Sequence, residues 1–165
     1  RADRYERNAM SSEYTEPTPT FAIITCSDTR TIETDTAGAA LKGLIAERGW
    51  VCLEHVVVED ERPFISGALL HAIEDLHADF VLTCGGSGLS PRDVTPEATI
   101  DVCKRNVPGS MQKTKRAMLS RALCMQRGPH LVINFPGSEK AARENWEAIA
   151  DVLPHAALMK QGGGH

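Results

Sequence analysis

The sequence predicts an α/β fold, a three-layer sandwich in which a mainly parallel sheet is covered by helices on both faces. Four short apolar runs alternate with longer segments whose apolar residues recur at helical spacing. Parallel neighbouring strands require crossover connections, and the intervening helices supply them. With 165 residues, of which 42% are apolar and 24% charged, the chain fits a single domain with one core.

The amino-terminal residues differ in composition from the rest of the chain. Residues 1–20 carry charges, serines and prolines but few apolar side chains, so they cannot bury much surface. We expect a flexible arm there and a single domain over residues 21–165. The first strand follows at residues 21–26, an unbroken apolar run bounded by Ser27 and Asp28.

The next elements repeat a helix-strand-helix order. A helix is expected over residues 35–47, because apolar residues recur there at helical spacing and Gly49 follows as a stop signal. Residues 51–58 are rich in β-branched residues and predict a strand, and residues 65–76 carry a second helical stripe. A strand over residues 80–83 then leads directly into glycines. The remaining expected elements are helices over residues 96–105, 117–126 and 138–152, a strand over residues 130–134 and a short helical tail from residue 154.

Composition excludes several classes of function. Lysine and arginine number 18 against 22 aspartates and glutamates, and the formal charge of −4 gives no general attraction to nucleic acid. Five cysteines without a CxxC pair argue against a disulfide framework or a zinc site. No apolar run approaches the ~20 residues of a membrane span, and the amino terminus has no signal-like segment. We therefore expect a cytoplasmic protein, away from membranes, with small-molecule partners.

The glycine loop after the third expected strand is the first candidate site. In open parallel sheets ligands bind beyond the carboxyl ends of the strands. At Gly85, Gly86, Ser87 and Gly88 the small side chains let backbone N–H groups approach an anion, and Ser87 adds a hydroxyl donor. A phosphate would fit there. A tight turn packed against a helix would use the same glycines, so the local sequence leaves both interpretations open.

Charged residues follow this loop and also follow the second strand. Arg92 could neutralise a phosphate while Asp93 holds a divalent cation; a local ion pair with a helix cap at Thr95 is the alternative. Asp60 supplies a second carboxylate at the same edge of the sheet, unless it belongs to a solvated acidic loop. Two carboxylates that converge on one cleft suit Mg²⁺-assisted phosphoryl or nucleotidyl chemistry.

A third loop, with Pro136, Gly137 and Ser138, again joins a strand to a helix. Ser138 and the first N–H groups of the helix could receive another anion, and Lys140 could assist. Ordinary capping of the helix by Ser138 is equally compatible with the sequence.

Taken together, these loops resemble a known family. Residues 83–88 (TCGGSG) followed by residues 91–98 (PRDVTPEA) are similar to the GGTG…RDVTPEA signature of MogA/MoaB proteins. The resemblance extends over nearly all of residues 21–160. It also includes residues 27–28, 58–61, 117–121 and 134–138.

The resemblance implies a molybdopterin-binding α/β sandwich, usually a homo-trimer or a dimer of trimers. The implied activity is transfer of AMP from ATP to molybdopterin with Mg²⁺, and the adenylylated product would pass to a molybdenum insertase. Asp60 and Asp93 would handle Mg²⁺ and transition-state geometry, while the glycine loop would cradle phosphate. Ser27, Ser120 and Ser138 would help to hold substrate.

Two other functions stay open. A MoaB-like protein could keep the fold and the pterin pocket and act as a binding protein without adenylyl transfer, although the retained Asp60 and Asp93 argue against this. A nucleotide-binding module for another phosphorylated ligand would also use the glycine loop.

The chain departs from the family pattern in two places. Ser87 stands where relatives usually have threonine, which keeps the hydroxyl group. Pro108 and Gly109 are followed almost at once by residues 110–114, whereas relatives carry an extra helical stretch between these two motifs. We interpret the second departure as a deletion or as a mobile loop beside the substrate cleft.

Overall fold

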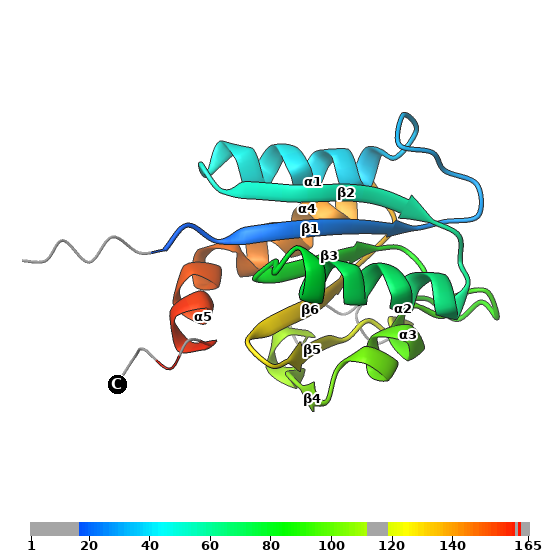
Figure 1. Ribbon diagram of the computed structural model, residues 1–165. Helices are drawn as coiled ribbons and strands as arrows, with labels where there is room; N and C mark the ends of the chain where they lie inside the picture. The colour runs from blue at the N-terminus through cyan, green and yellow to red at the C-terminus, as the bar shows by residue number, and fades with distance from the viewer. Residues whose placement is uncertain (1–16, 112–118, 161, 163–165) are drawn as a thin grey trace, which may run out of the picture.

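The computed structural model describes residues 17–111, 119–160 and 162, and its centre is a six-stranded sheet in the order β2-β1-β3-β6-β5-β4 (Figure 1). The first four strands in this order run parallel, while β5 is antiparallel to β6 and β4 is antiparallel to β5. The strands are β1 Thr20–Cys26, β2 Val51–Val58, β3 Phe80–Cys84, β4 Arg105–Asn106, β5 Cys124–Arg127 and β6 His130–Phe135. The predicted mainly parallel sheet is confirmed.

Helices cover both faces of this sheet, which gives the predicted three layers. The helices α1 (Thr36–Glu47) and α4 (Glu139–Ile149) pack on one face, and α2 (Arg62–Leu70) and α3 (Thr95–Val102) pack on the other (Figure 1). The shorter elements are the π-helix η1 His71–Asp75, the 3₁₀ helices η2 Pro108–Met111 and η4 Ala150–Val152, and α5 Leu153–Lys160. Among the described helices, none is long and apolar enough to cross a membrane.

Strand β1 shows why the central strands are apolar without alternation. Phe21 and Ile23 belong to the core beneath α1 and α4, while Ala22 and Ile24 belong to the core beneath α2 and α3. All four side chains are buried. A strand that is covered on both faces has no polar face, as the unbroken apolar run predicts.

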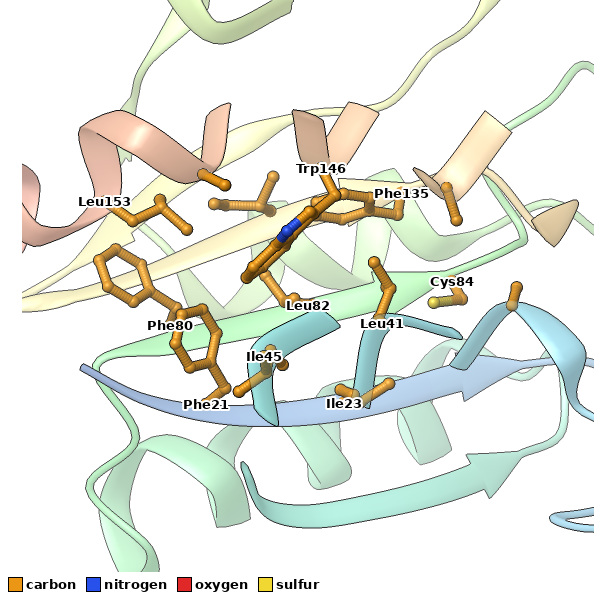
Figure 2. Packing of buried hydrophobic residues seen from close by; sticks show 14 of the residues in the cluster. Phe21, Ile23, Leu41, Ile45, Phe80, Leu82, Cys84, Phe135, Trp146 and Leu153 are labelled. Carbon is orange, nitrogen blue, oxygen red and sulfur yellow. The ribbon is translucent and has the colours of Figure 1, made fainter. Parts of the chain in front are cut away.

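An aromatic cluster forms the part of the core beneath α1 and α4 that lies nearest the amino-terminal ends of the strands. Phe21 stacks on Phe80 at a centroid distance of 5.2 Å and on Trp50 at 5.7 Å. Trp146 of α4 approaches Phe21 at 5.8 Å, and Figure 2 shows it lying across this layer. The two tryptophans are therefore packing residues, at the end of the sheet opposite the candidate site.

A buried aspartate joins α1 to two strands. Asp35 caps the helix by accepting the Gly38 N–H at 3.0 Å. Its other carboxylate oxygen accepts the Thr25 hydroxyl at 2.5 Å and lies 2.7 Å from Nε2 of His55. This network attaches the first turn of α1 to β1 and β2.

One predicted helix is wrong. Residues 124–127 form β5 instead of the end of a helix over residues 117–126, and residues 119–123 are not α-helical either. Residues 117 and 118 lie outside the described part of the chain. The pairing of Cys124 with Ile133 and of Met125 with Val132 places buried side chains against the sheet, and this tertiary contact overrides local helix propensity.

Other element boundaries moved. The helix expected to reach Arg105 ends at Val102, because Cys103 takes an extended conformation and Arg105 enters β4. The helix expected through residue 152 ends at Ile149, and a 3₁₀ turn follows. Nearly all of the expected arm lies outside the described residues, as do residues 112–118, so the expected arm and the expected deletion or mobile loop both stay predictions.

The order of the strands defines where a ligand would bind. After β1 the chain crosses through α1 to β2 on one side, and after β2 it crosses through α2 to β3 on the other side of β1. The connection that leaves β1 runs through α1 on one face, and the connection that leaves β3 runs through α3 on the opposite face. This is the topological switch point at which open α/β sheets hold their ligands.

Candidate functional site at the carboxyl edge of the sheet

The loops after β1, β2, β3 and β6 meet at one edge of the sheet. The Ser27 N–H donates to the Val58 carbonyl at 2.9 Å, and the Gly85 N–H donates to the Phe135 carbonyl at 3.0 Å. These bonds join the first loop to the second and the third to the fourth. The sequence-predicted residues that the structure brings to this edge are Ser27, Asp60, Gly85, Gly86, Ser87, Gly88, Arg92, Asp93, Pro136, Gly137 and Ser138.

The glycine loop takes a conformation that side chains would prevent. Gly85 has φ +90° and Gly86 has φ +67°, both in the left-handed region. A Cβ atom on Gly85 would lie 2.7 Å from the Cys26 carbonyl oxygen, and one on Gly86 would overlap the Thr95 side chain. Thr95 fixes the loop by donating its N–H to the Gly86 carbonyl and its hydroxyl to the Gly85 carbonyl, each at 3.0 Å. The tight-turn interpretation is thus correct, and it leaves the phosphate interpretation open.

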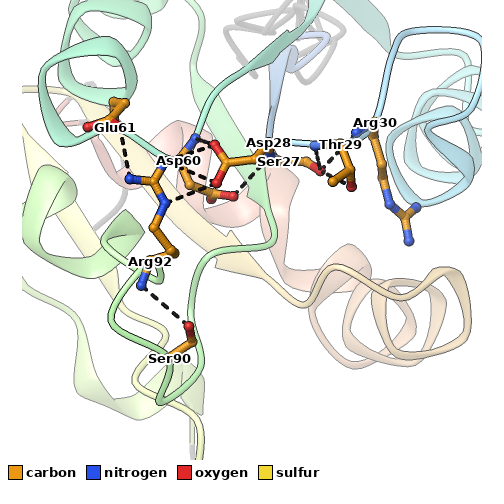
Figure 3. A network of polar contacts seen from close by, with 8 residues as sticks. All are labelled: Ser27, Asp28, Thr29, Arg30, Asp60, Glu61, Ser90 and Arg92. Carbon is orange, nitrogen blue, oxygen red and sulfur yellow. Dashed lines mark hydrogen bonds and ion pairs between the residues drawn. The ribbon is translucent and has the colours of Figure 1, made fainter.

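Asp60 is held by the loop after β1. Its N–H donates to Oδ1 of Asp28 at 2.9 Å, and its Oδ2 accepts the Asp28 N–H at 3.1 Å (Figure 3). Its Oδ1 is buried and has no hydrogen-bond partner in the described part of the chain. That oxygen lies 3.1 Å from where a Cβ atom on Gly86 would stand, so it faces the glycine loop.

The electrostatic surroundings of Asp60 favour its protonated form. Burial, followed by the negative charge of Asp28 and then of Asp93, raises the pKa of the Asp60 carboxyl, although the Asp28 N–H and Arg92 act in the opposite direction. A carboxylate that lacks one partner and sits close to other carboxylates is prepared to receive a cation.

Asp93 lies in the turn between the glycine loop and α3. Its Oδ2 accepts the Ser90 N–H at 3.0 Å, and a Cβ atom on Gly88 would lie 2.8 Å from the same oxygen. The glycine therefore lets the Asp93 carboxylate approach the loop. The structure brings Asp60 close to Gly86 and Asp93 close to Gly88, so the two carboxylates lie along one loop.

Arg92 joins the loops after three strands. Its Nε and Nη2 donate to the two carboxylate oxygens of Asp28, both at 3.0 Å, and its Nη1 donates to Glu61 at 2.9 Å. Figure 3 shows the guanidinium group between Glu61 and the pair Asp28 and Asp60. Arg92 thus makes ion pairs with distant residues, and not the local pair with Asp93 that was the alternative.

The candidate serines have local partners. Ser27 accepts the N–H groups of Thr29 at 3.2 Å and Arg30 at 3.1 Å, which closes the turn after β1. Ser138 caps α4 by accepting the Ala141 N–H at 3.3 Å. Both serines therefore shape their loops, and this is compatible with a further contact to substrate.

The other candidates differ in position. Ser120 is exposed and lies next to Arg121, whose N–H donates to the Ser87 carbonyl at 2.9 Å, so Ser120 adjoins the glycine loop. Gly137 packs against Gly85, while Pro136 is half-buried beside it. Lys140 is exposed in the first turn of α4 and has no hydrogen-bond or ion-pair partner among the described residues.

Two residues of this site were missed as functional candidates in the sequence. Asp28 stands at the second position after β1, as Asp60 does after β2, so the place of Asp28 after a strand was a usable signal. Arg121 offered no such signal, because its guanidinium group reaches Gly88, Asp93 and Glu97, which lie 24 to 33 residues away. Only the three-dimensional structure reveals that role.

The carboxylates define the type of cation that the edge could hold. Within residues 17–111, 119–160 and 162, no group of three or more histidine, cysteine, aspartate or glutamate side chains could bind a metal ion. Mg²⁺ often uses only one or two protein carboxylates and completes its shell with water and substrate phosphates. Asp60 and Asp93 match that requirement.

An open α/β sheet with a glycine loop and two carboxylates at its switch point is typical of proteins that bind small phosphorylated ligands. Comparison with known proteins makes the class specific. The family model described as a probable molybdopterin binding domain matches residues 22–155, and the chain belongs to this family. The resemblance to MogA/MoaB proteins is thereby confirmed.

Relatives of known name support the same placement. The chain is 34% identical over 154 residues to a molybdopterin adenylyltransferase of Helicobacter pylori, with 86% of this chain and 88% of that protein covered. It is 39% identical over 152 residues to the molybdenum cofactor synthesis protein cinnamon of Drosophila melanogaster, where the match covers 85% of this chain but only 25% of that protein.

Solved structures agree with the fold. The crystal structure of the molybdopterin biosynthesis enzyme MoaB from Thermus thermophilus superimposes with a TM-score of 0.80 at 37% identity, covering 88% of this chain and 98% of that one. A Mog protein from Mycobacterium ulcerans gives 0.76 at 31% identity, covering 87% of this chain and 99% of that one. The two branches of the family therefore share this architecture.

Proposed function

We propose that the chain transfers AMP from ATP to molybdopterin with Mg²⁺, giving adenylylated molybdopterin and pyrophosphate. One observation carries the proposal: Asp60 presents a buried, unpartnered Oδ1 to the glycine loop whose other end carries Asp93. Curated relatives at 32–36% identity bear the name molybdopterin adenylyltransferase.

The two aspartates fit a magnesium site. Asp60 and Asp93 would hold Mg²⁺, which neutralises phosphate charge at the reacting centre when it is bound. A cation beside Asp60 would pair with its orphaned oxygen and offset the repulsion between the neighbouring carboxylates, so the raised pKa of Asp60 would fall on binding. The donor set of hard oxygen atoms suits this ion.

The rest of the edge would orient two substrates. An oxygen of the molybdopterin phosphate attacks the α-phosphorus of ATP, a new P–O bond forms, and the bond to pyrophosphate breaks. The backbone of Gly85, Gly86, Ser87 and Gly88 would cradle a phosphate, while Ser27, Ser120 and the loop of Pro136, Gly137 and Ser138 would hold substrate, with Lys140 assisting. In this reaction the chain contributes orientation and charge neutralisation.

Arg92 would act through exchange of partners. In this structure Asp28 and Glu61 occupy all three arms of its guanidinium group. Contact with phosphate would release one of these carboxylates. The ion pairs are exposed, so such an exchange would cost little.

Oligomerisation belongs to the same proposal. The edge strand β2 exposes Val51 and Leu53, and the first turn of α2 exposes Phe64. An apolar edge strand is a surface that a second subunit can cover. A homo-trimer or dimer of trimers in the cytoplasm, with transfer of product to a molybdenum insertase, fits the family resemblance, and multi-angle light scattering would measure the subunit number.

The first experiment is anaerobic incubation of the pure protein with molybdopterin, ATP and Mg²⁺, with pyrophosphate and adenylylated pterin measured together. Asp93→Asn should abolish turnover and keep the fold, because the amide retains the size of the carboxylate. The control is Asp151→Asn, which removes an exposed carboxylate whose ion-pair partner among the described residues is Arg48. We expect the control to turn over normally.

The wild-type result decides between the two activities. Release of pyrophosphate with formation of adenylylated pterin supports the enzyme. Tight molybdopterin binding without adenylylated product would instead assign the chain to the MoaB-like binding role. The similarity to Thermus MoaB is the reason to test for this role.

A further inference from the structure

Arg121 contacts the glycine loop and the turn after it at several points, although its position in the sequence does not suggest this. Its N–H donates to the Ser87 carbonyl at 2.9 Å, and its Nε donates to the Gly88 carbonyl at 2.8 Å. Its Nη2 donates to the Asp93 carbonyl at 2.5 Å, and its Nη1 pairs with the Glu97 carboxylate. One residue thus holds both ends of the segment that carries Asp93.

We propose that Arg121 is a positioning residue that sets the glycine loop and Asp93 in the geometry required for adenylyl transfer. The proposal rests on the proposed function for its kinetic part. Its structural part, the ordering of residues 87–93, stands on the contacts alone.

The chemistry of the guanidinium group explains why arginine is needed. Its N–H donors lie in one plane and point in fixed directions, so they can satisfy two carbonyls and a carboxylate together. A lysine ammonium could meet Glu97 as a point charge but could not reproduce the planar fork. Loss of Arg121 would leave the Gly88 and Asp93 carbonyls without these donors, and the turn between them would lose its clamp.

Glu97 anchors the other side of this clamp. It stands in the first turn of α3, and the hydrogen bond from Arg121 lowers the pKa of its carboxyl. Its second oxygen is buried without a partner in the described part of the chain, so the pair with Arg121 carries most of the compensation for that carboxylate. Arg121 therefore connects the glycine loop to helix α3.

The same clamp sets the position of Ser120. Because the backbone of Arg121 is bonded to the Ser87 carbonyl, the preceding residue must stand beside the glycine loop. A substrate contact at Ser120 would then depend on Arg121 as well.

Arg127, at the end of the strand β5 that follows Arg121, is a matched control. Arg127 of β5 also donates to a carbonyl, that of Val102 at 2.9 Å, and pairs with the Glu74 carboxylate at 2.5 Å. The side chains of Arg121 and Arg127 are 36% and 33% exposed. Arg127 makes no contact with the glycine loop, so it reports on the cost of losing a half-buried arginine alone.

The test compares Arg121→Gln and Arg121→Lys with Arg127→Gln in the whole protein. Amide hydrogen exchange should accelerate in residues 86–94 for Arg121→Gln, and to a smaller extent for Arg121→Lys, but not for Arg127→Gln; this readout follows loop order and needs no turnover. In the kinetic assay, kcat should fall about 100-fold for Arg121→Gln while the KM for ATP changes less than about threefold, since misplacement by about 1 Å costs that much. Arg121→Lys should recover about a tenth of the wild-type kcat.

The outcomes separate the two proposals. A wild-type protein without turnover would overturn the proposed function, and the exchange data would still judge Arg121. If Arg121→Gln shows wild-type exchange in residues 86–94, or matches Arg127→Gln in kcat, then Arg121 has no positioning role. Should Arg121→Gln fail to fold, the same comparison is made with Arg121→Lys, for which faster exchange in this loop supports the proposal and wild-type exchange overturns it.

Discussion

Asp28 and Asp60 each donate a backbone N–H to the carboxylate of the other, at 3.1 and 2.9 Å. This reciprocal pair joins the loops that follow two neighbouring strands, and it gives Oδ2 of Asp60 a donor, while Oδ1 has no partner among the described residues. Arg92 offsets part of the repulsion by pairing with Asp28. The site thus keeps a carboxylate in an unfavourable electrostatic position that a cation would relieve.

Asp60→Asn should separate stability from activity. The raised pKa of Asp60 means that its contribution to stability is fully present below the ordinary aspartate pKa and is lost as the pH rises through the folded-state value. The neutral amide avoids that loss, so at pH 7 the variant should melt about 1–3 °C higher, a gain kept small by solvent screening. Adenylyl transfer should disappear. Equal melting temperatures near pH 3 are the control, and a lower melting temperature at pH 7 would contradict this assignment.

Arg92→Gln should shift the pH profile of the reaction. Arg92 acts to lower the pKa of Asp60, so its removal should raise that pKa further. If ionised Asp60 is required, the acid limb of the kcat/KM profile should move to higher pH. Arg62→Gln serves as the control, because Arg62 pairs with Asp101 and is equally exposed, at 52% against 54% for Arg92. An unchanged acid limb would remove Arg92 from the electrostatics of the site.

Gly86→Ala should damage both the fold and the site. The φ of +67° is strained for alanine, and the new methyl group would overlap Thr95 and crowd Asp60. We expect a loss of about 2–4 kcal/mol in the free energy of unfolding, measured by urea denaturation. Gly43→Ala is the matched control. That glycine lies exposed inside α1 with nothing near its Cβ position, so alanine there should stabilise by about 0.5–1 kcal/mol.

Asp35→Ala should cost more than the loss of a helix cap. The change removes the bond to Gly38 together with those to Thr25 and His55, and we expect about 2–4 kcal/mol at pH 7. Ser138→Ala, which removes a cap alone, should cost about 1 kcal/mol.

The Asp35 effect should also depend on pH. Burial acts to raise the pKa of Asp35, but the hydrogen bonds from Thr25, Gly38 and His55 outweigh it and the pKa is lowered. The stability that Asp35 contributes is therefore present above the ordinary aspartate pKa and is lost as the pH falls through the folded-state value. Urea denaturation between pH 7 and pH 3 should show the difference from wild type shrinking in acid. A difference that is constant with pH would assign the whole effect to packing.

The sequence predicted the parallel part of the fold, and suggested a candidate site at its carboxyl edge, because both depend on local patterns. Residues 80–84 form an apolar run that ends in glycines, and this pattern identifies a buried strand followed by a loop without further information. The antiparallel strands β4 and β5 carry no such pattern. The strand β4 has only two exposed residues, and β5 has Cys124 and Met125 buried side by side, without alternation.

The same reasoning explains which site residues were found. Asp60 stands just after the end of β2, and Asp93 stands in the loop that joins β3 to α3, where sequence position alone suggests a role. The partners that orient them are remote: Arg92 reaches Asp28 across 64 positions, and Arg121 reaches Gly88 across 33. Such contacts arise from the packing of loops and leave no periodic signal in the chain.

The close approach of Gly85 and Gly137 has a consequence for how the protein can vary. A Cβ atom on Gly137 would lie 3.3 Å from the Gly85 Cα, and one on Gly85 would lie 2.7 Å from the Cys26 carbonyl oxygen. Three loops therefore share one small volume, and each limits the size of its neighbours. A larger residue at either glycine must displace a second loop along with its own. Substitutions that change ligand specificity can therefore occur at the outer residues of these loops but not at the inner ones.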